Sequence, residues 1–258
     1  MIFSSTDMLQ WLNSMFWPFV RIGMMLMVAP VFGGNLVPVR IKLLFALLLT
    51  WVMLPLIPPV PAIDPLSAAS VLITIQQMII GLAIGFALQL VFAALIVGGQ
   101  TVAMGMGLGF ASMVDPQNGV QVPVIGQYYV VLATLLFLAM NGHLALIGVL
   151  ADSFQSLPIG GAGLDREYYR EIAHWGTRLF AGGLLVALPA VTAILLVNMA
   201  FGVVSRAAPQ LNIFGVGFPV TLTLGFVVIL VTLPGLFPQM SKMLTEALLT
   251  VQQFGRVR

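Results

Sequence analysis

Residues 68–97, AASVLITIQQMIIGLAIGFALQLVFAALIV, decide the fold. The run holds no charged side chain and shows no alternation of apolar and polar positions, so in lipid it satisfies its backbone only as an α-helix. Its surroundings are equally uncharged, because residues 65–114 contain no Asp, Glu, Lys or Arg. One helix of that length would rise about 75 Å, more than twice the thickness of a hydrocarbon core. The segment therefore cannot be one ordinary span.

The composition of the whole chain agrees with a membrane location. Of its 258 residues, 60% are hydrophobic and 7% are charged, whereas about 25% charged residues are usual in soluble domains. So few charges cannot cover a water-facing surface, which indicates an integral membrane protein. A net charge of +2 without a basic cluster excludes a nucleic-acid interface. The absence of cysteine excludes disulfides and thiolate chemistry. Since no Lys or Arg precedes Arg21, we expect the first apolar segment to be retained rather than cleaved as a signal.

Apolar runs between charged positions predict an all-α, polytopic membrane protein with about six hydrophobic helical segments in hairpins, some not fully spanning. Five prolines between Pro55 and Pro65, PLIPPVPAIDP, set a firm helix boundary. The charged residues 152–178 predict a solvent-exposed hairpin that contains a short amphipathic helix on an interface. Counting Lys and Arg in the loops assigns no sides, because the basic loops would fall on opposite faces. The predicted segments are residues 8–28, 43–60, 68–97, 122–150, 179–204 and 213–236.

Five glycines lie within residues 98–109. Each costs a helix about 1 kcal/mol relative to alanine, so we predict a broken backbone here. At membrane depth such a break is tolerated only where protein buries it or a cavity lies beside it, which indicates a pore. The methionines Met104, Met106 and Met113 form either a deformable seal or ordinary core filling.

Isolated polar and small residues mark further candidate positions. Arg21 is a functional-site candidate as an intramembrane charge, although snorkelling or a structural ion pair would also explain it. Asp115, before Pro116, is expected to cap the next helix or to pair with a buried arginine. His143 is interpreted as a hydrogen-bonded structural histidine rather than a proton relay. Gly81 and Gly85 form a G-x-x-x-G pair for close helix packing.

No pattern in the chain predicts catalysis. The zinc motif H-E-x-x-H is absent, and the candidate spans hold no carboxylates for aspartyl chemistry or proton coupling. The run from Gly105 to Gly109 fails as a phosphate loop, because Phe110 stands where the last glycine is needed and no strand precedes it. We expect no enzyme, no cofactor and no metal site.

Several stretches together resemble one family. The most specific is residues 205–219, SRAAPQLNIFGVGFP, which includes Arg206 as a further structural polar residue. Residues 107–116 (GLGFASMVDP), 136–143 (LFLAMNGH) and 157–160 (LPIG) support it, as does Arg21 followed by Ala29 and Pro30. On these grounds, nearly end to end, the chain resembles the FliR family of the flagellar type III protein export gate.

The resemblance implies a subunit of the bacterial inner membrane and flagellar basal body that joins several copies of FliP and FliQ. FlhB and FlhA are further implied partners, with membrane lipid around the assembly. Together the subunits would surround a closed channel for unfolded flagellar proteins. Residues 1–178 would be the FliP-like part, with a plug segment within 98–115, and residues 179–258 the FliQ-like hairpin.

In the plug, bulky side chains would close the bore and glycines would let it move aside. The residues in question are Met104, Gly105, Met106, Gly107, Leu108, Gly109, Phe110 and Met113. Energy would come from a soluble ATPase or from the membrane potential, and we expect the isolated chain to be unstable. The alternatives are a homologous subunit of a virulence injectisome, a small-solute channel or transporter, and a structural scaffold.

Overall fold

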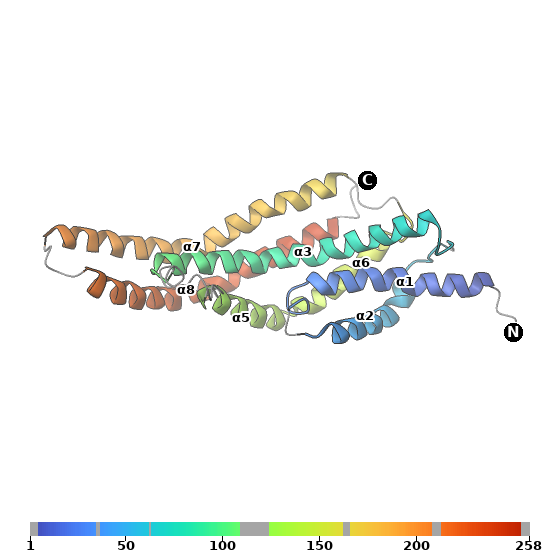
Figure 1. Ribbon diagram of the computed structural model, residues 1–258, viewed down its shortest axis with the longest axis horizontal. Coiled ribbons are helices and arrows are strands. Elements are labelled where there is room, and N and C mark those ends of the chain that lie inside the picture. Colours follow the sequence, from blue (N-terminus) through green and yellow to red (C-terminus); the bar gives the residue numbers. More distant parts are fainter. Residues whose placement is uncertain are drawn as a thin grey trace, which may run out of the picture. The chain divides into compact units, whose positions relative to one another are not determined.

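The computed structural model describes residues 5–34, 37–61, 63–108, 124–161, 166–207 and 213–253, where every regular element is a helix (Figure 1). This confirms the all-α prediction. Within these residues, four helices are long and apolar enough to cross a membrane, and a bent helix pair would make a fifth span. The helices are α1 (Ser5–Val28), α2 (Val39–Met53), the short 3-10 helix η1 (Leu54–Leu56), α3 (Ala68–Gly105), α5 (Val124–Ala139), α6 (Gly142–Ser156), α7 (Arg166–Ala207) and α8 (Ile213–Gln253).

The helices are divided between two compact units. The first comprises residues 1–90, 137–176 and 244–258, and the second comprises residues 91–136 and 177–243. Helices α3, α5, α7 and α8 therefore each contribute residues to both units. The division of the chain at residue 178 that the resemblance implies stays a prediction.

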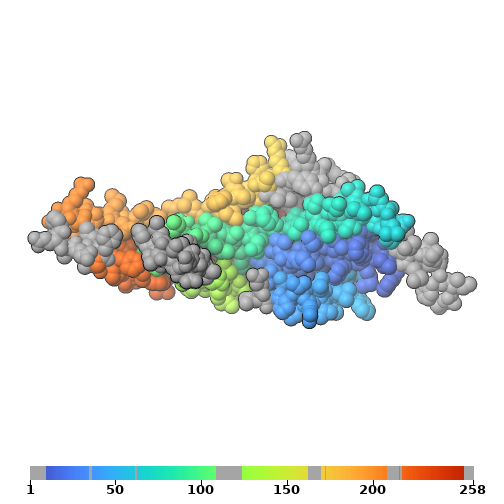
Figure 2. Space-filling model, in the orientation of Figure 1, coloured from blue at the N-terminus to red at the C-terminus, as the bar shows by residue number. Residues whose placement is uncertain are grey.

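Within the first unit, the proline-rich connection ends a helix as predicted. Helix α2 stops at Met53, η1 follows, and α3 begins at Ala68. Two side chains hold the connection in place: the Asn13 amide donates to the Ile63 carbonyl at 2.7 Å, and the Gln155 amide donates to the Leu56 carbonyl at 2.7 Å. Helix α2 packs against α1 and lies at the surface of this unit, where Figure 2 shows it in light blue.

The predicted break at the glycine-rich run begins later than expected. The sequence predicts broken backbone from residue 98, but α3 continues as a helix to Gly105. The reason lies in packing within the second unit: a Cβ at Gly98 would lie 2.8 Å from the Gly183 carbonyl oxygen, and one at Gly99 would lie 2.7 Å from the Cα of Gly126. These glycines allow helix backbones to touch, and that tertiary contact outweighs their poor helix propensity.

Two further boundaries differ from the predictions. Residues 122–150 are not one segment, because α5 and α6 meet at a bend of 68°, where Asn141 takes a left-handed backbone with φ of 56°. Nor does the charged region hold a separate short helix, since α7 runs uninterrupted from Arg166 to Ala207. On it, Trp175 is buried and Leu179 is half-buried, while the side chains of Tyr168 and Ile172 lie outside the described residues.

Candidate functional site

The end of α3, in the second unit, is the root of the predicted plug. The helix closes with a pair of hydrogen bonds, from the Leu108 amide to the Ala103 carbonyl at 3.0 Å and from the Gly107 amide to the Met104 carbonyl at 3.1 Å. Gly107 has φ of 83°. This is a Schellman cap, which needs a left-handed residue that glycine adopts without steric cost. Gly107 thus stops the helix at a defined place.

Met106, inside this cap, is fully buried. Its amide donates to the Val102 carbonyl at 3.0 Å, and its side chain lies directly against Gly225 of α8. Close apolar contact of this kind fixes a side chain that is flexible in isolation. Met106 therefore fastens the end of α3 to α8 within the second unit.

The other predicted plug residues are placed differently. Met104 is 66% exposed, and Gly105 and Leu108 are half-buried. Gly105 faces Ile194 of α7, where an added Cβ would have room at 3.7 Å. The predictions for Gly109, Phe110, Met113 and Asp115 lie outside the described residues.

Helices α7 and α8 are joined near this root by a polar contact. The Thr221 hydroxyl is placed 3.3 Å from the Asn198 side-chain oxygen and 2.9 Å from the Gly217 carbonyl. Helix α8 also contains Pro219, Pro234 and Pro238. Each proline removes a backbone donor, so the hydrogen-bond ladder of α8 is interrupted at three places.

The first unit is built around Arg21 of α1. Gly81 and Gly85 of α3 face this helix: a Cβ at Gly81 would collide with the Arg21 carbonyl oxygen, and one at Gly85 would lie 2.7 Å from the Met25 carbonyl oxygen. The two glycines thus let α1 and α3 approach along their backbones.

The guanidinium of Arg21 is fully buried and hydrogen-bonded to neutral groups. Its Nε donates to the Gln77 side-chain oxygen at 2.7 Å, and its Nη2 donates to the Leu157 carbonyl at 2.7 Å. Its Nη1 donates to the Ser153 carbonyl at 2.8 Å and to the Ser153 hydroxyl at 3.1 Å. The guanidinium carbon also lies 4.3 Å from the ring centre of Phe154. The planar fork of arginine suits acceptors spread in this way.

The position of these acceptors explains how the charge is tolerated. Ser153 and Leu157 belong to the last turn of α6 and the residue after it, where the helix dipole favours a cation. The Ser153 carbonyl also accepts from the Leu157 amide at 3.0 Å. The aromatic face of Phe154 adds a cation–π attraction. Arg21 therefore caps α6 and ties α1, α3 and α6 together. Among the described residues these contacts are those of a buried cation held by neutral acceptors, and a fully buried guanidinium is not a snorkelling side chain. The ion pair that the sequence left open stays a prediction, because Asp115 lies outside the described residues.

The other predicted polar residues that the structure describes are His143 and Arg206. Within the described part of the chain, His143 Nδ1 is buried and has no hydrogen-bond partner, so the hydrogen bond expected at this atom is not found. Arg206, in the last turn of α7, is exposed.

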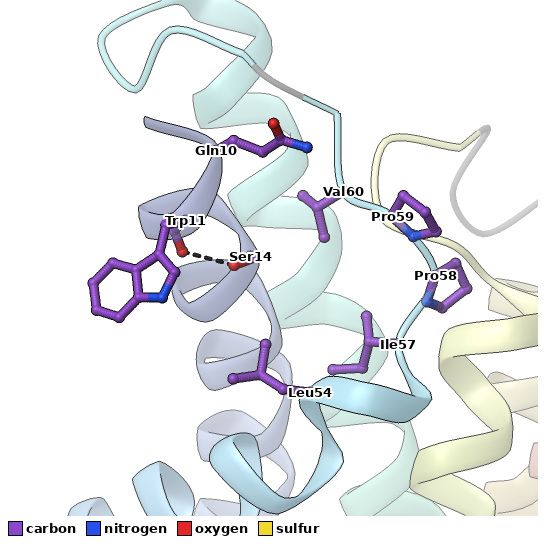
Figure 3. A pocket seen from close by; sticks show the side chains of 8 residues that line it. All are labelled: Gln10, Trp11, Ser14, Leu54, Ile57, Pro58, Pro59 and Val60. Carbon is purple, nitrogen blue, oxygen red and sulfur yellow. Dashed lines mark hydrogen bonds between the residues drawn. The ribbon is translucent and has the colours of Figure 1, made fainter. Parts of the chain in front are cut away.

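A cavity of about 340 Å³ lies between α1 and the proline-rich connection. Figure 3 shows Leu54, Ile57 and Val60 along it, while the Trp11 ring points away and the Ser14 hydroxyl donates to the Trp11 carbonyl at 2.7 Å. None of its lining side chains is titratable, so it supplies no group for acid–base chemistry. The cavity is lined by Gln10, Trp11, Ser14, Leu54, Ile57, Pro58, Pro59 and Val60.

Sequence reasoning missed the partners of the two key residues. Gln77, Ser153 and Leu157 lie 56, 132 and 136 positions from Arg21, and Gly225 is similarly remote from Met106. No local pattern connects such positions. The adjacent glutamines Gln76 and Gln77 inside an apolar run were the one available signal.

A chain with several apolar helices of membrane-spanning length, a buried arginine hydrogen-bonded through all three guanidinium nitrogens and a capped helix end beside a glycine-rich run is a polytopic membrane protein. The family described as Bacterial export proteins, family 1, matches residues 12–247. The chain belongs to this family of bacterial export proteins, within which it is a member of the FliR family.

Individual relatives align in sequence with this chain over most of their length. The chain is 38% identical to the Flagellar biosynthetic protein FliR of Escherichia coli (strain K12), covering 94% of this chain and 93% of that one. It is 39% identical to the protein of the same name from Pectobacterium carotovorum subsp. carotovorum, over 95% and 93%. The FliR protein of Bacillus subtilis (strain 168) is 29% identical over 85% of each chain.

Proposed function

We propose that this chain is a structural subunit of the flagellar type III protein export gate in the bacterial inner membrane, at the basal body. With FliP and FliQ it would form a closed channel for unfolded flagellar proteins, and FlhB and FlhA would be neighbours. The segment that follows α3 would be the plug of that channel. Family membership over residues 12–247 supports the export role.

The observation that carries the plug is the end of α3. The helix is stopped by a cap at Gly107, and Met106 is held against α8. A channel for polypeptides needs a wide bore when open and no ion leak when shut. A segment with a fixed root meets both needs, because it can be displaced by a substrate and still return to the same place. Apolar and thioether side chains close such a bore by excluding water.

The exposed apolar faces support assembly with partners. In α3, 67% of the most apolar window is buried within this chain, but the figures are 28% for α7 and 22% for α8. Large side chains on these two helices are open, including Leu196 at 64%, Met199 at 70% and Val231 at 73%. Such faces need lipid or other apolar subunits to cover them. The FliP and FliQ subunits are the cover we propose.

The test is co-expression with FliP and FliQ, followed by purification and an ion-leak assay in vesicles. We compare the native chain, a variant lacking residues 105–110, and Leu66→Ala as a control at a site that is 95% exposed. A stable complex that leaks only with the deletion supports the plugged gate. A chain that purifies alone and conducts would favour a solute channel instead. A stable complex that stays tight in all three forms would favour a scaffold.

A further inference from the structure

Gly225 of α8 leaves no room for a side chain. A Cβ at this position would lie 2.5 Å from Cγ, 2.7 Å from Cε and 2.8 Å from Sδ of Met106. Those separations are well inside van der Waals contact. Any other residue at position 225 therefore requires Met106 to move.

Met106 has little freedom to move. Its side chain is fully buried, and its backbone is held by the hydrogen bond to Val102 on one side and by the Gly107 cap on the other. In a close-packed interior an inserted methyl group displaces its neighbours rather than fitting beside them. A side chain at position 225 would thus displace the Met106 side chain from its buried place against α8.

The need to move Met106 arises at Gly225 and not at two other glycines of the same helices. At Gly105 an added Cβ would make ordinary contacts, 3.7 Å and 3.8 Å from two side-chain carbons of Ile194, and at Gly235 of α8 nothing lies within 4 Å. The same helices therefore supply matched positions where alanine is accommodated.

We propose that Gly225 is a positioning residue for the segment that begins at Met106. By seating Met106, it holds the root of that segment on α7 and α8, and the root stays seated while the channel opens further along the chain. Unseating it would expose a buried thioether. The inference rests on the proposed function, but the position of the root can be measured without any export.

The first experiment measures the root alone, in membranes containing the full chain. The chain has no cysteine, so Gly105→Cys with Ile194→Cys makes one defined pair. A Cβ at position 105 would lie 3.7 Å from Cγ2 of Ile194, so the side chains at the two positions meet and a disulfide between them is within reach. We expect rapid oxidative crosslinking, seen as a mobility shift on a non-reducing gel. Failure of this pair to crosslink would overturn the proposal.

Three added substitutions then separate position from folding. Gly225→Ala should lower the crosslinking rate about tenfold, because overpacking displaces Met106. Gly235→Ala should change it less than about twofold. Met106→Ala in the native background removes the seated side chain without adding a clash and should lower the rate to a similar extent, while the amount of chain in the membrane reports folding separately. An unchanged rate with Gly225→Ala alone overturns the positioning role. A native rate with Met106→Ala would also overturn the positioning role.

The second experiment connects the root to the channel. Cells should export flagellar proteins equally well with the engineered disulfide between positions 105 and 194 formed and after its reduction. Export that stops on oxidation and returns on reduction would overturn the fixed root. Gly225→Ala should also raise the ion leak of the assembled complex. Slower crosslinking without a leak would leave the positioning role standing and count against the plug function.

Discussion

Replacing Arg21 with methionine tests the central contact of the first unit. The substitution keeps a long side chain but removes every donor of the guanidinium. The Gln77 side-chain oxygen and the Leu157 carbonyl lose the Arg21 donors, whereas the Ser153 carbonyl still accepts from the Leu157 amide at 3.0 Å. Two orphaned acceptors cost about 1–3 kcal/mol each. Allowing for imperfect packing of the new side chain, we expect a loss of about 3–6 kcal/mol.

That loss is a large part of the stability of an ordinary domain, about 5–15 kcal/mol. Arg21→Met should therefore leave little folded chain in the membrane when it is co-expressed with the proposed partners FliP and FliQ. Arg21→Lys keeps the charge, but its single nitrogen cannot span acceptors on α3 and after α6, so we expect an intermediate loss of about 2–3 kcal/mol.

The matched control is Arg40→Met, since Arg40 is an exposed arginine of the same unit and should change stability by less than about 0.5 kcal/mol. The measurements are the steady-state amount of chain in the membrane and the temperature at which half of the detergent-solubilised complex aggregates. Equal results for Arg21→Met and Arg40→Met would refute the reasoning. Equal results for Arg21→Lys and the native chain would refute the role of the fork.

Two further predictions concern the backbone. Gly99→Ala should destabilise the chain by about 1–3 kcal/mol, because its Cβ would lie 2.7 Å from the Cα of Gly126. The control is Gly148→Ala, which should be neutral or slightly stabilising because nothing lies within 4 Å of the added Cβ. Equal aggregation temperatures for the two variants would contradict this account. Val31 takes a φ of 71°, a backbone conformation that costs a β-branched residue about 1–2 kcal/mol. Val31→Gly should therefore raise the aggregation temperature by relieving this strain. A fall in that temperature would show that the valine side chain contributes more than the strain costs.

Composition and local patterns predicted much of the fold. Uncharged apolar runs predicted the helices, and the prolines after Met53 predicted the boundary before α3. The end of α3 was predicted in kind but not in place. Gly98 and Gly99 look like helix breakers when only propensity is considered. In the folded chain they let α3 touch its neighbours, so packing decides and the helix ends at the left-handed Gly107 instead.

The site was harder to predict than the helices. A lone charge in an apolar segment identified Arg21 as a candidate, but its acceptors are neutral groups from distant segments, which no spacing rule connects. The bend between α5 and α6 had a local signal in Asn141-Gly142, a dipeptide typical of turns. The apolar residues on both sides hid it, because they read as one continuous span. Burial of Met106 could not be foreseen without knowing that Gly225 faces it.

The hydrogen bonds of Arg21 have a consequence for the synthesis and membrane insertion of the protein. Gln77 follows Arg21 by 56 residues and Ser153 follows it by 132. At about 5–20 residues per second of synthesis, the charge waits on the order of ten seconds for its last acceptors. During that time α1 carries an uncompensated cation, so we expect it to stay with the insertion machinery or at the lipid headgroups until α6 emerges. Ribosome-stalled chains ending shortly before and well after Leu157 should then differ in how readily α1 crosslinks to lipid, and identical crosslinking would show that α1 inserts without waiting.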